Sequence, residues 1–94
     1  MHITFKLNEY TEIPQDRIDS LPRWGSCDTA ISQIMMFDTV KCDRSDAINY
    51  LTHIGYDDPE QLQIESNETL TGRVLWLACL DCRDNGSTQF YMGE

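Results

Sequence analysis

The chain has 94 residues, 40% of them hydrophobic and 10% aromatic, and its 16 acidic residues against 7 basic ones give a formal net charge of -9. This length and composition exclude a multidomain protein and a wholly disordered one, and we expect a single acidic α+β domain over residues 1–94. The negative field repels nucleic-acid phosphates and anionic membrane surfaces but attracts basic proteins, so direct nucleic-acid or membrane binding is not expected.

The first predicted element is a strand at the N-terminus. Ile3, Phe5 and Leu7 alternate with polar residues, which is the period-2 pattern of a strand with one buried face. After it, Pro14 suits the first position of a short helix that Pro22 would end.

The beginning of the chain also bears on its location. It has neither the basic residues nor the long apolar stretch of a secretion signal. The longest apolar run, Val74 to Leu80, is far shorter than the roughly 20 residues that span a bilayer. We therefore expect a cytoplasmic protein without a membrane segment.

Two helices are predicted in the middle of the chain, after a loop around Trp24. Apolar residues recur at helical spacing behind Asp28, a suitable N-cap, which predicts a helix over about residues 29–39. The second helix would begin after Asp43 or Ser45 and end at Gly55. Its expected buried stripe consists of Ala47, Ile48, Leu51 and Ile54. Beyond it, Asp58-Pro59-Glu60 is typical of a turn that opens a further short helix.

The last third of the chain allows two interpretations. The run from Val74 to Leu80 is apolar throughout, so periodicity cannot distinguish a buried strand from a buried helix. Its length, its Val and Trp content and the preceding Gly72 favour a strand. Asn85-Gly86 is the preferred pair for a two-residue hairpin turn. We therefore favour a C-terminal hairpin over a C-terminal helix, with residues 88–92 as the returning strand.

In this hairpin Cys82 would face Gln89 and Leu80 would face Tyr91. The resulting fold class is α+β: a small, mainly antiparallel sheet made of the N-terminal strand and the C-terminal hairpin. Two or three helices would pack on one face of that sheet.

The cysteines provide half of a metal site. Cys79 and Cys82 form a C-x-x-C motif, which can supply two ligands of a tetrahedral zinc site. The second half is missing, because Cys27 and Cys42 lie apart and neither belongs to another such motif. We prefer four reduced thiols, with Cys79 packed as a small hydrophobe, and expect neither a metal nor another cofactor. A zinc-stabilised adaptor that uses Cys79 and Cys82 is kept as an alternative.

No sequence motif of an enzyme occurs. The chain lacks the nucleophile-elbow, zinc-protease, phosphate-binding-loop and dinucleotide-binding patterns. His2 stands at the chain terminus, and His53 lies late in a predicted helix, where a histidine commonly interacts with the helix dipole. We expect no catalytic residues and no enzymatic activity.

The acidic residues between the second helix and the apolar run form the strongest candidate site. These residues are Asp57, Asp58, Glu60, Glu65 and Glu68. Helix capping does not account for this group. Carboxylates spaced along a surface can imitate a phosphate backbone and occupy a nucleic-acid channel of another protein. Trp24 and Tyr56 are candidate aromatic anchors beside them. The simpler alternative is a solvated acidic face.

The predicted function is a small acidic protein-binding module that inhibits a basic, nucleic-acid-handling protein by mimicking nucleic acid. Small phage or plasmid proteins that block host defence nucleases have this general profile of size and charge. A further alternative is a small homodimeric structural protein in which residues 88–92 of two copies pair.

Overall fold

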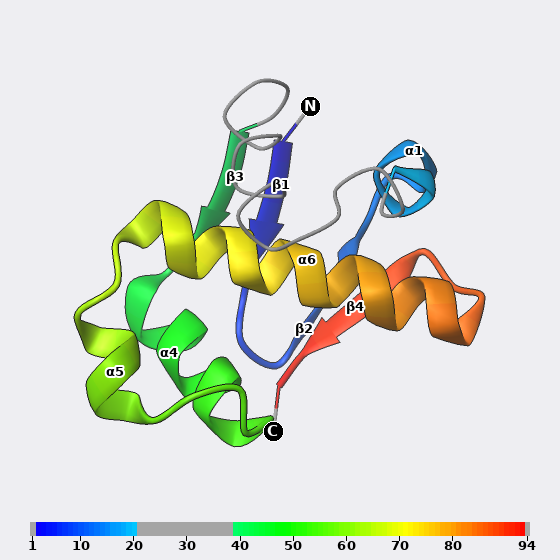
Figure 1. The fold of residues 1–94 in the computed structure, drawn as a ribbon. Helices are drawn as coiled ribbons and strands as arrows, with labels where there is room; N and C mark the ends of the chain where they lie inside the picture. The colour runs from blue at the N-terminus through cyan, green and yellow to red at the C-terminus, as the bar shows by residue number, and fades with distance from the viewer. Residues whose placement is uncertain (1, 21–38, 94) are drawn as a thin grey trace.

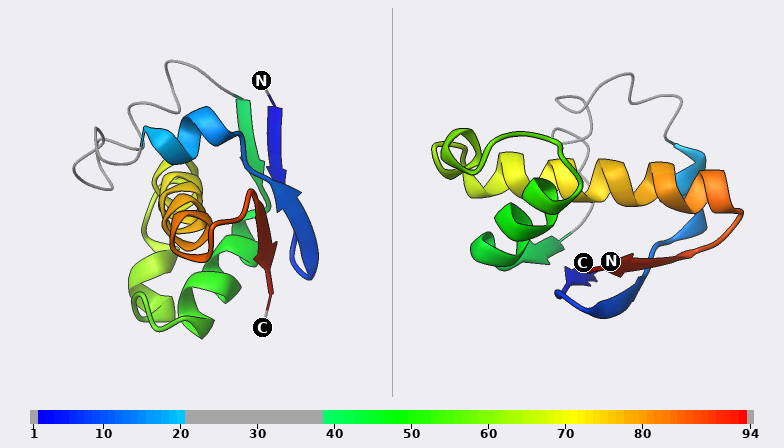
Figure 2. Two further views of the ribbon diagram at one scale, coloured as in Figure 1. Left: turned by 90° about the vertical axis from the view of Figure 1, so that its right-hand side faces the viewer. Right: turned by 90° about the horizontal axis from the view of Figure 1, so that it is seen from below.

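The computed structural model describes residues 2–20 and 39–93, and in them short strands and helices are mixed along the chain (Figure 1). The elements in chain order are β1 (His2–Phe5), β2 (Glu9–Glu12), α1 (Gln15–Asp19), β3 (Thr39–Cys42), α4 (Arg44–His53), α5 (Pro59–Gln63), α6 (Asn67–Asn85) and β4 (Gln89–Met92). Figure 2 shows these helices on one side of the strands, with α6 running across them. The α+β class is confirmed at this coarse level.

The strands form two pairs rather than one mainly antiparallel sheet. β1 pairs with β3 in parallel, and β2 pairs with β4 antiparallel, with Tyr10 opposite Tyr91. A tight turn over residues 6–8 joins β1 to β2, where the Glu9 N–H donates to the Lys6 carbonyl at 3.2 Å. Asn8 takes a left-handed backbone conformation there, with φ of 63°. The predicted antiparallel arrangement is therefore wrong for half of the strand pairing.

Two local predictions in the N-terminal half are confirmed, the first strand and the helix start at Pro14. Ile3 and Phe5 of β1 are both buried, as their alternation indicates. α1 begins directly after Pro14, whereas Pro22 lies outside the described residues. Most of the helix predicted over residues 29–39 also lies outside them, and its last residue begins β3 instead.

The start of α4 could be predicted from a few neighbouring residues because its cap is local. The Asp43 carboxylate accepts hydrogen bonds from the backbone N–H groups of Ser45 and Asp46, at 2.9 and 3.3 Å. The Ser45 hydroxyl also donates to it at 2.6 Å, and these bonds lower the pKa of Asp43. The cap is thus made by residues adjacent in sequence, so no tertiary contact is needed to specify it.

The predicted end of α4, the start of α5 and the buried stripe of α4 are confirmed, except at one residue of the stripe. Ala47 and Leu51 are buried in α4 and Ile48 is partly buried, but Ile54 is 44% exposed. Gly55 has the expected left-handed φ, at 76°, and α5 begins at Pro59 as predicted.

The predicted C-terminal hairpin is wrong, because the apolar run is the middle of α6. Ser66 caps this helix, with its hydroxyl oxygen accepting from the Thr69 N–H at 3.1 Å. Asn85 is the last helical residue, and Gly86 ends the helix in a left-handed conformation with φ of 63°. The same Asn-Gly pair that suits a hairpin turn also suits a helix C-terminus, because each of these structures needs a residue with positive φ. Gly86 is that residue here.

The full length of α6 shows a helical pattern that its apolar centre hides. Its buried side chains recur every three to four residues and include Leu70, Val74, Leu75, Ala78, Cys79 and Cys82. Because residues 74–82 are helical, the predicted pairs of Cys82 with Gln89 and Leu80 with Tyr91 do not form. β4 instead finds its partner strand, β2, near the other end of the chain.

Phe90 of β4 lies where the strands meet the helices. Its ring makes edge-to-face contacts with Phe5 of β1 and Tyr50 of α4, at centroid distances of 5.8 and 5.5 Å. These aromatic contacts hold β4, β1 and α4 around one hydrophobic core.

Candidate functional site

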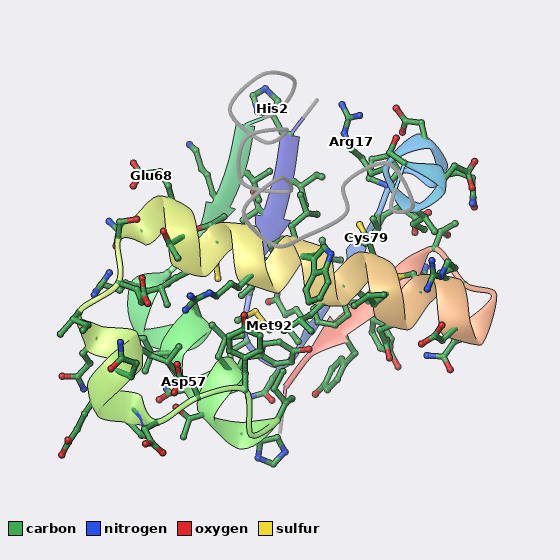
Figure 3. All side chains as sticks on the ribbon, viewed as in Figure 1. His2, Arg17, Asp57, Glu68, Cys79 and Met92 are labelled. Carbon is green, nitrogen blue, oxygen red and sulfur yellow. The ribbon has the colours of Figure 1, made fainter. Side chains whose placement is uncertain are left out.

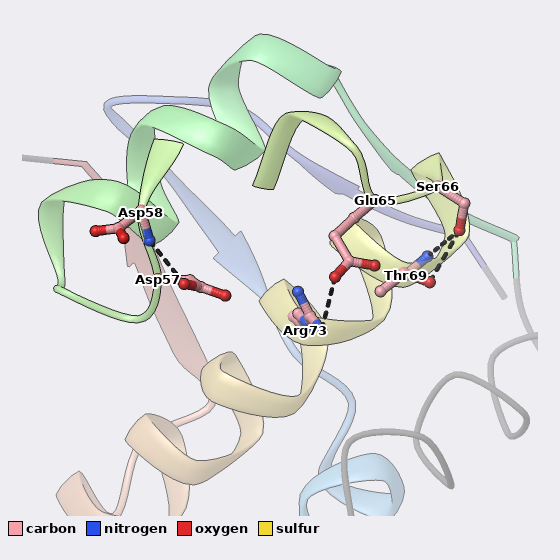
Figure 4. A network of polar contacts seen from close by, with 6 residues as sticks. All are labelled: Asp57, Asp58, Glu65, Ser66, Thr69 and Arg73. Carbon is pink, nitrogen blue, oxygen red and sulfur yellow. Dashed lines mark hydrogen bonds and ion pairs between the residues drawn. The ribbon is translucent and has the colours of Figure 1, made fainter. Parts of the chain in front are cut away.

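The five predicted acidic residues lie along the segment that joins α4 to α6. Asp57 and Glu68 lie near its two ends and are well separated in Figure 3. Asp57 is half-buried, and its carboxylate accepts from the Asp58 N–H at 2.8 Å (Figure 4). The structure therefore does not gather all five carboxylates into one cluster.

Glu65 is occupied within the fold. Its Oε1 lies 3.4 Å from Nη2 of Arg73 on α6, and the two side chains are only 25% and 18% exposed (Figure 4). The guanidinium carbon of Arg73 also lies 5.2 Å from the centre of the Tyr56 ring, a cation–π contact. Glu65 and Tyr56, both predicted to contact a partner, thus help to fix the chain against α6.

A second arginine holds the same segment from α4. Nη1 of Arg44 donates to Asn67 Oδ1 at 2.9 Å, and Nη2 donates to the Gln63 carbonyl at 2.6 Å. Arg44 therefore links the end of α5 to the start of α6. The two arginines nearest to the acidic segment are both engaged in positioning it.

Three of the predicted acids remain available at the surface. Asp58, Glu60 and Glu68 are exposed, and within residues 2–20 and 39–93 none of them forms an ion pair. Asp58 and Glu60 lie at the start of α5, and Glu68 lies in the first turn of α6. These carboxylates therefore add unneutralised negative charge to this side of the molecule.

Ile64 is the residue of this surface that the sequence analysis missed. It ends α5 and is 75% exposed, whereas Leu62, two residues earlier, is fully buried. A helix places residues two apart on different faces, so Leu62 and Ile64 could not both face the core, and that spacing was the available signal. We name Asp58, Glu60, Ile64 and Glu68 the acidic ridge.

Two further predicted features stand apart from this surface. Trp24 and Cys27 lie outside the residues that the structure describes. Cys79 and Cys82 lie on the buried face of α6, and burial raises the pKa of the Cys79 thiol to about 12 and also raises that of Cys82. In the described part of the chain, no group of three or more His, Cys, Asp or Glu side chains could hold a metal ion.

The buried thiols predict a loss of stability in alkali. A thiol with a raised pKa stays protonated in the folded protein, while the unfolded chain ionises above its ordinary value of 9.0. For Cys79, stability is thus retained below pH 9 and lost as the pH rises from 9 towards 12, by up to about 1.4 kcal/mol per pH unit, and Cys82 acts in the same direction. Cys42, whose pKa burial also raises to about 12, contributes in the same direction.

Denaturant unfolding of the wild type and of Cys79→Ala between pH 8 and pH 10 checks this expectation. This range limits the contribution of Tyr50, whose pKa burial raises from 10.0 to about 12. We expect the variant to be less stable at pH 8 but to lose stability more slowly as the pH rises. Parallel pH profiles for the two proteins would contradict a buried, protonated Cys79.

No protein family, curated protein or solved structure matches this chain. Among the helices described here, none is long and apolar enough to cross a membrane.

Proposed function

We propose that this chain is a small acidic module that binds and inhibits a basic protein that handles nucleic acid. The observation that carries this proposal is the acidic ridge, whose carboxylates are exposed and form no ion pair within the described residues, and whose isoleucine is 75% exposed. Arg73 is paired with Glu65, and Arg44 donates to the neutral oxygens of Asn67 and Gln63.

The ridge has the two components that a protein-binding surface needs. The carboxylates of Asp58, Glu60 and Glu68 would occupy lysine and arginine side chains that otherwise contact phosphates. Ile64 would supply an apolar contact on the same segment, and interface hot spots combine apolar anchors with charged neighbours in this way. Burying its side chain contributes roughly 1.5–3 kcal/mol at most.

This mechanism is competitive, since the module and the nucleic acid would use the same basic surface of the partner. The net charge of -9 would speed the encounter and make it sensitive to salt. A host defence nuclease opposed by a phage or plasmid protein is the partner class we favour, which places the interaction in the cytoplasm.

We expect the loss of affinity on removing negative charge to depend on where that charge lies. We expect the triple variant Asp58→Asn, Glu60→Gln, Glu68→Gln to bind the partner at least about tenfold more weakly, a loss of about 1.4 kcal/mol. Glu65 is left intact because its pairing with Arg73 supports the fold. The partner is first captured from a nuclease-treated lysate, and its displacement from a labelled oligonucleotide is then titrated with each variant.

A matched control separates local from net charge. The variant Asp16→Asn, Asp81→Asn, Asp84→Asn also removes three negative charges, so the net charge again changes from -9 to -6. These three substitutions lie on α1 and on the last turns of α6. We expect this control to displace the oligonucleotide nearly as well as the wild type. Equal losses in both triple variants would reduce the effect to net charge, and undiminished displacement by the ridge variant would refute the proposal.

A further inference from the structure

One edge of β4 has no partner strand among the described residues. The Ile13 N–H donates to the Thr88 carbonyl at 2.7 Å, and the Asn8 N–H donates to the Met92 carbonyl, so these carbonyls face β2. In an antiparallel pair, successive residues direct their backbone groups alternately to the two edges. The backbone groups of Gln89, Tyr91 and Gly93 therefore point away from β2. Figure 1 shows β4 at the end of the row of strands, beyond β2.

Part of this edge is already satisfied within the chain. The Gln89 N–H donates to the Ser87 hydroxyl at 3.0 Å, and that hydroxyl lies 3.5 Å from the Gln89 carbonyl. No such contact is seen for the backbone of Tyr91 among the residues described. The edge is therefore most open at Tyr91, one residue from the end of β4.

The charge distribution favours a second copy of this chain as the occupant. No charged residue occurs from Asn85 to Gly93, although the chain as a whole carries -9. If two copies paired along β4, their acidic β2 strands would be three strand spacings apart, roughly 14 Å. That separation exceeds the screening length of about 8 Å at physiological salt, so repulsion between Glu12 and its counterpart would be weak.

The exposed tyrosines favour the same arrangement and set its register. Tyr10 and Tyr91 are opposite each other on β2 and β4, are 70% and 43% exposed, and have ring centroids 5.0 Å apart. A twofold axis at Tyr91 would continue this pair into a row of four tyrosines across four strands. Cross-strand aromatic neighbours of this kind stabilise a sheet.

We propose that the chain forms a weak homodimer through antiparallel pairing of β4 with β4 of a second copy. Tyr91 and the partner subunit's Tyr91 exchange two backbone hydrogen bonds, and the Gly93 N–H donates to the partner subunit's Gln89 carbonyl. The contact is short, so its dissociation constant lies in the micromolar to millimolar range. It goes beyond the proposed inhibition, because the acidic ridge lies on α5 and α6 and not on β4.

Analytical ultracentrifugation over a wide concentration range tests this dimer. We expect the wild type to dimerise, and more strongly at high salt, because salt screens the repulsion between two acidic copies. Binding through the acidic ridge has the opposite salt dependence, so the two proposals can fail separately. A wild type that is monomeric at every concentration and salt level overturns the dimer.

Two tyrosine variants provide a matched pair. Tyr91→Glu places two like charges directly opposite each other at the axis and should weaken the dimer at least about tenfold. Tyr10→Glu adds the same charge on the same face, one strand farther from the axis, and should weaken the dimer much less. Equal dimerisation of Tyr91→Glu and the wild type, or equal losses in both variants, would overturn pairing through β4.

A third variant tests the backbone hydrogen bonds. Tyr91→Pro removes the outward N–H, and an edge strand tolerates proline where the N–H does not face its partner strand. We expect a monomer with the wild-type far-ultraviolet circular dichroism and the wild-type cooperativity of unfolding. A folded Tyr91→Pro variant that dimerises as well as the wild type would also overturn the proposal.

Discussion

Replacing Phe90 with alanine is expected to destabilise the fold by about 3–5 kcal/mol. This is a large share of the roughly 5–15 kcal/mol by which proteins of this size are stable. The Phe90 side chain is 2% exposed and packs edge-to-face against Phe5 and Tyr50, with ring centroids 5.8 and 5.5 Å apart. Its removal leaves a cavity between β1, β4 and α4, which the surrounding backbone can close only in part.

Equilibrium unfolding in urea, followed by fluorescence and by circular dichroism, measures this effect. Gln89→Ala serves as the control because Gln89 is the exposed neighbour on the same strand. Its substitution should change the free energy of unfolding by no more than about 0.5 kcal/mol. Similar costs for the two variants would mean that β4 does not pack against the core as described.

Ala78→Pro is expected to prevent folding under ordinary conditions. Ala78 is fully buried in the middle of the 19-residue helix α6. Proline there removes a backbone hydrogen bond and brings its ring against the preceding turn, which costs about 3 kcal/mol or more before any disruption of the core. The loss of helical circular dichroism and of cooperative unfolding would report the effect.

Asn67→Pro is the control for this helix. Asn67 is the first helical residue of α6, where proline is well tolerated because the N–H has no partner within the helix. The variant loses the hydrogen bond from Arg44, so a cost of about 1 kcal/mol is expected. A folded Ala78→Pro variant would contradict a helix over residues 67–85.

Several elements could be predicted because their signals lie within a few neighbouring residues. Asp43 caps α4 by accepting hydrogen bonds from the backbone N–H groups of Ser45 and Asp46. Pro59 begins α5, and Ile3 and Phe5 alternate into the core from β1. In each case the energetically decisive contact is local, so the pattern is visible in a short window.

The candidate site was predicted in part. The sequence shows that five carboxylates lie between residues 57 and 68, but it does not show which of them remain free. Arg73 approaches Glu65 and Tyr56 only because α6 packs alongside this segment. The exposure of Ile64 likewise depends on Leu62 filling the core beneath α5. Availability to a partner is thus a property of the packing and not of the composition.

The acidic character, the mixture of helix and strand, and the local starts of β1, α4 and α5 can all be predicted from short stretches of sequence. The helical state of residues 74–80 and the pairing of β4 with β2 depend instead on contacts between distant parts of the chain. An apolar run buries its side chains equally well as a strand or as a helix, and Asn85-Gly86 suits the end of either. The choice depends on the surfaces available for packing, and core residues such as Phe5 and Tyr50, far away in the sequence, provide them.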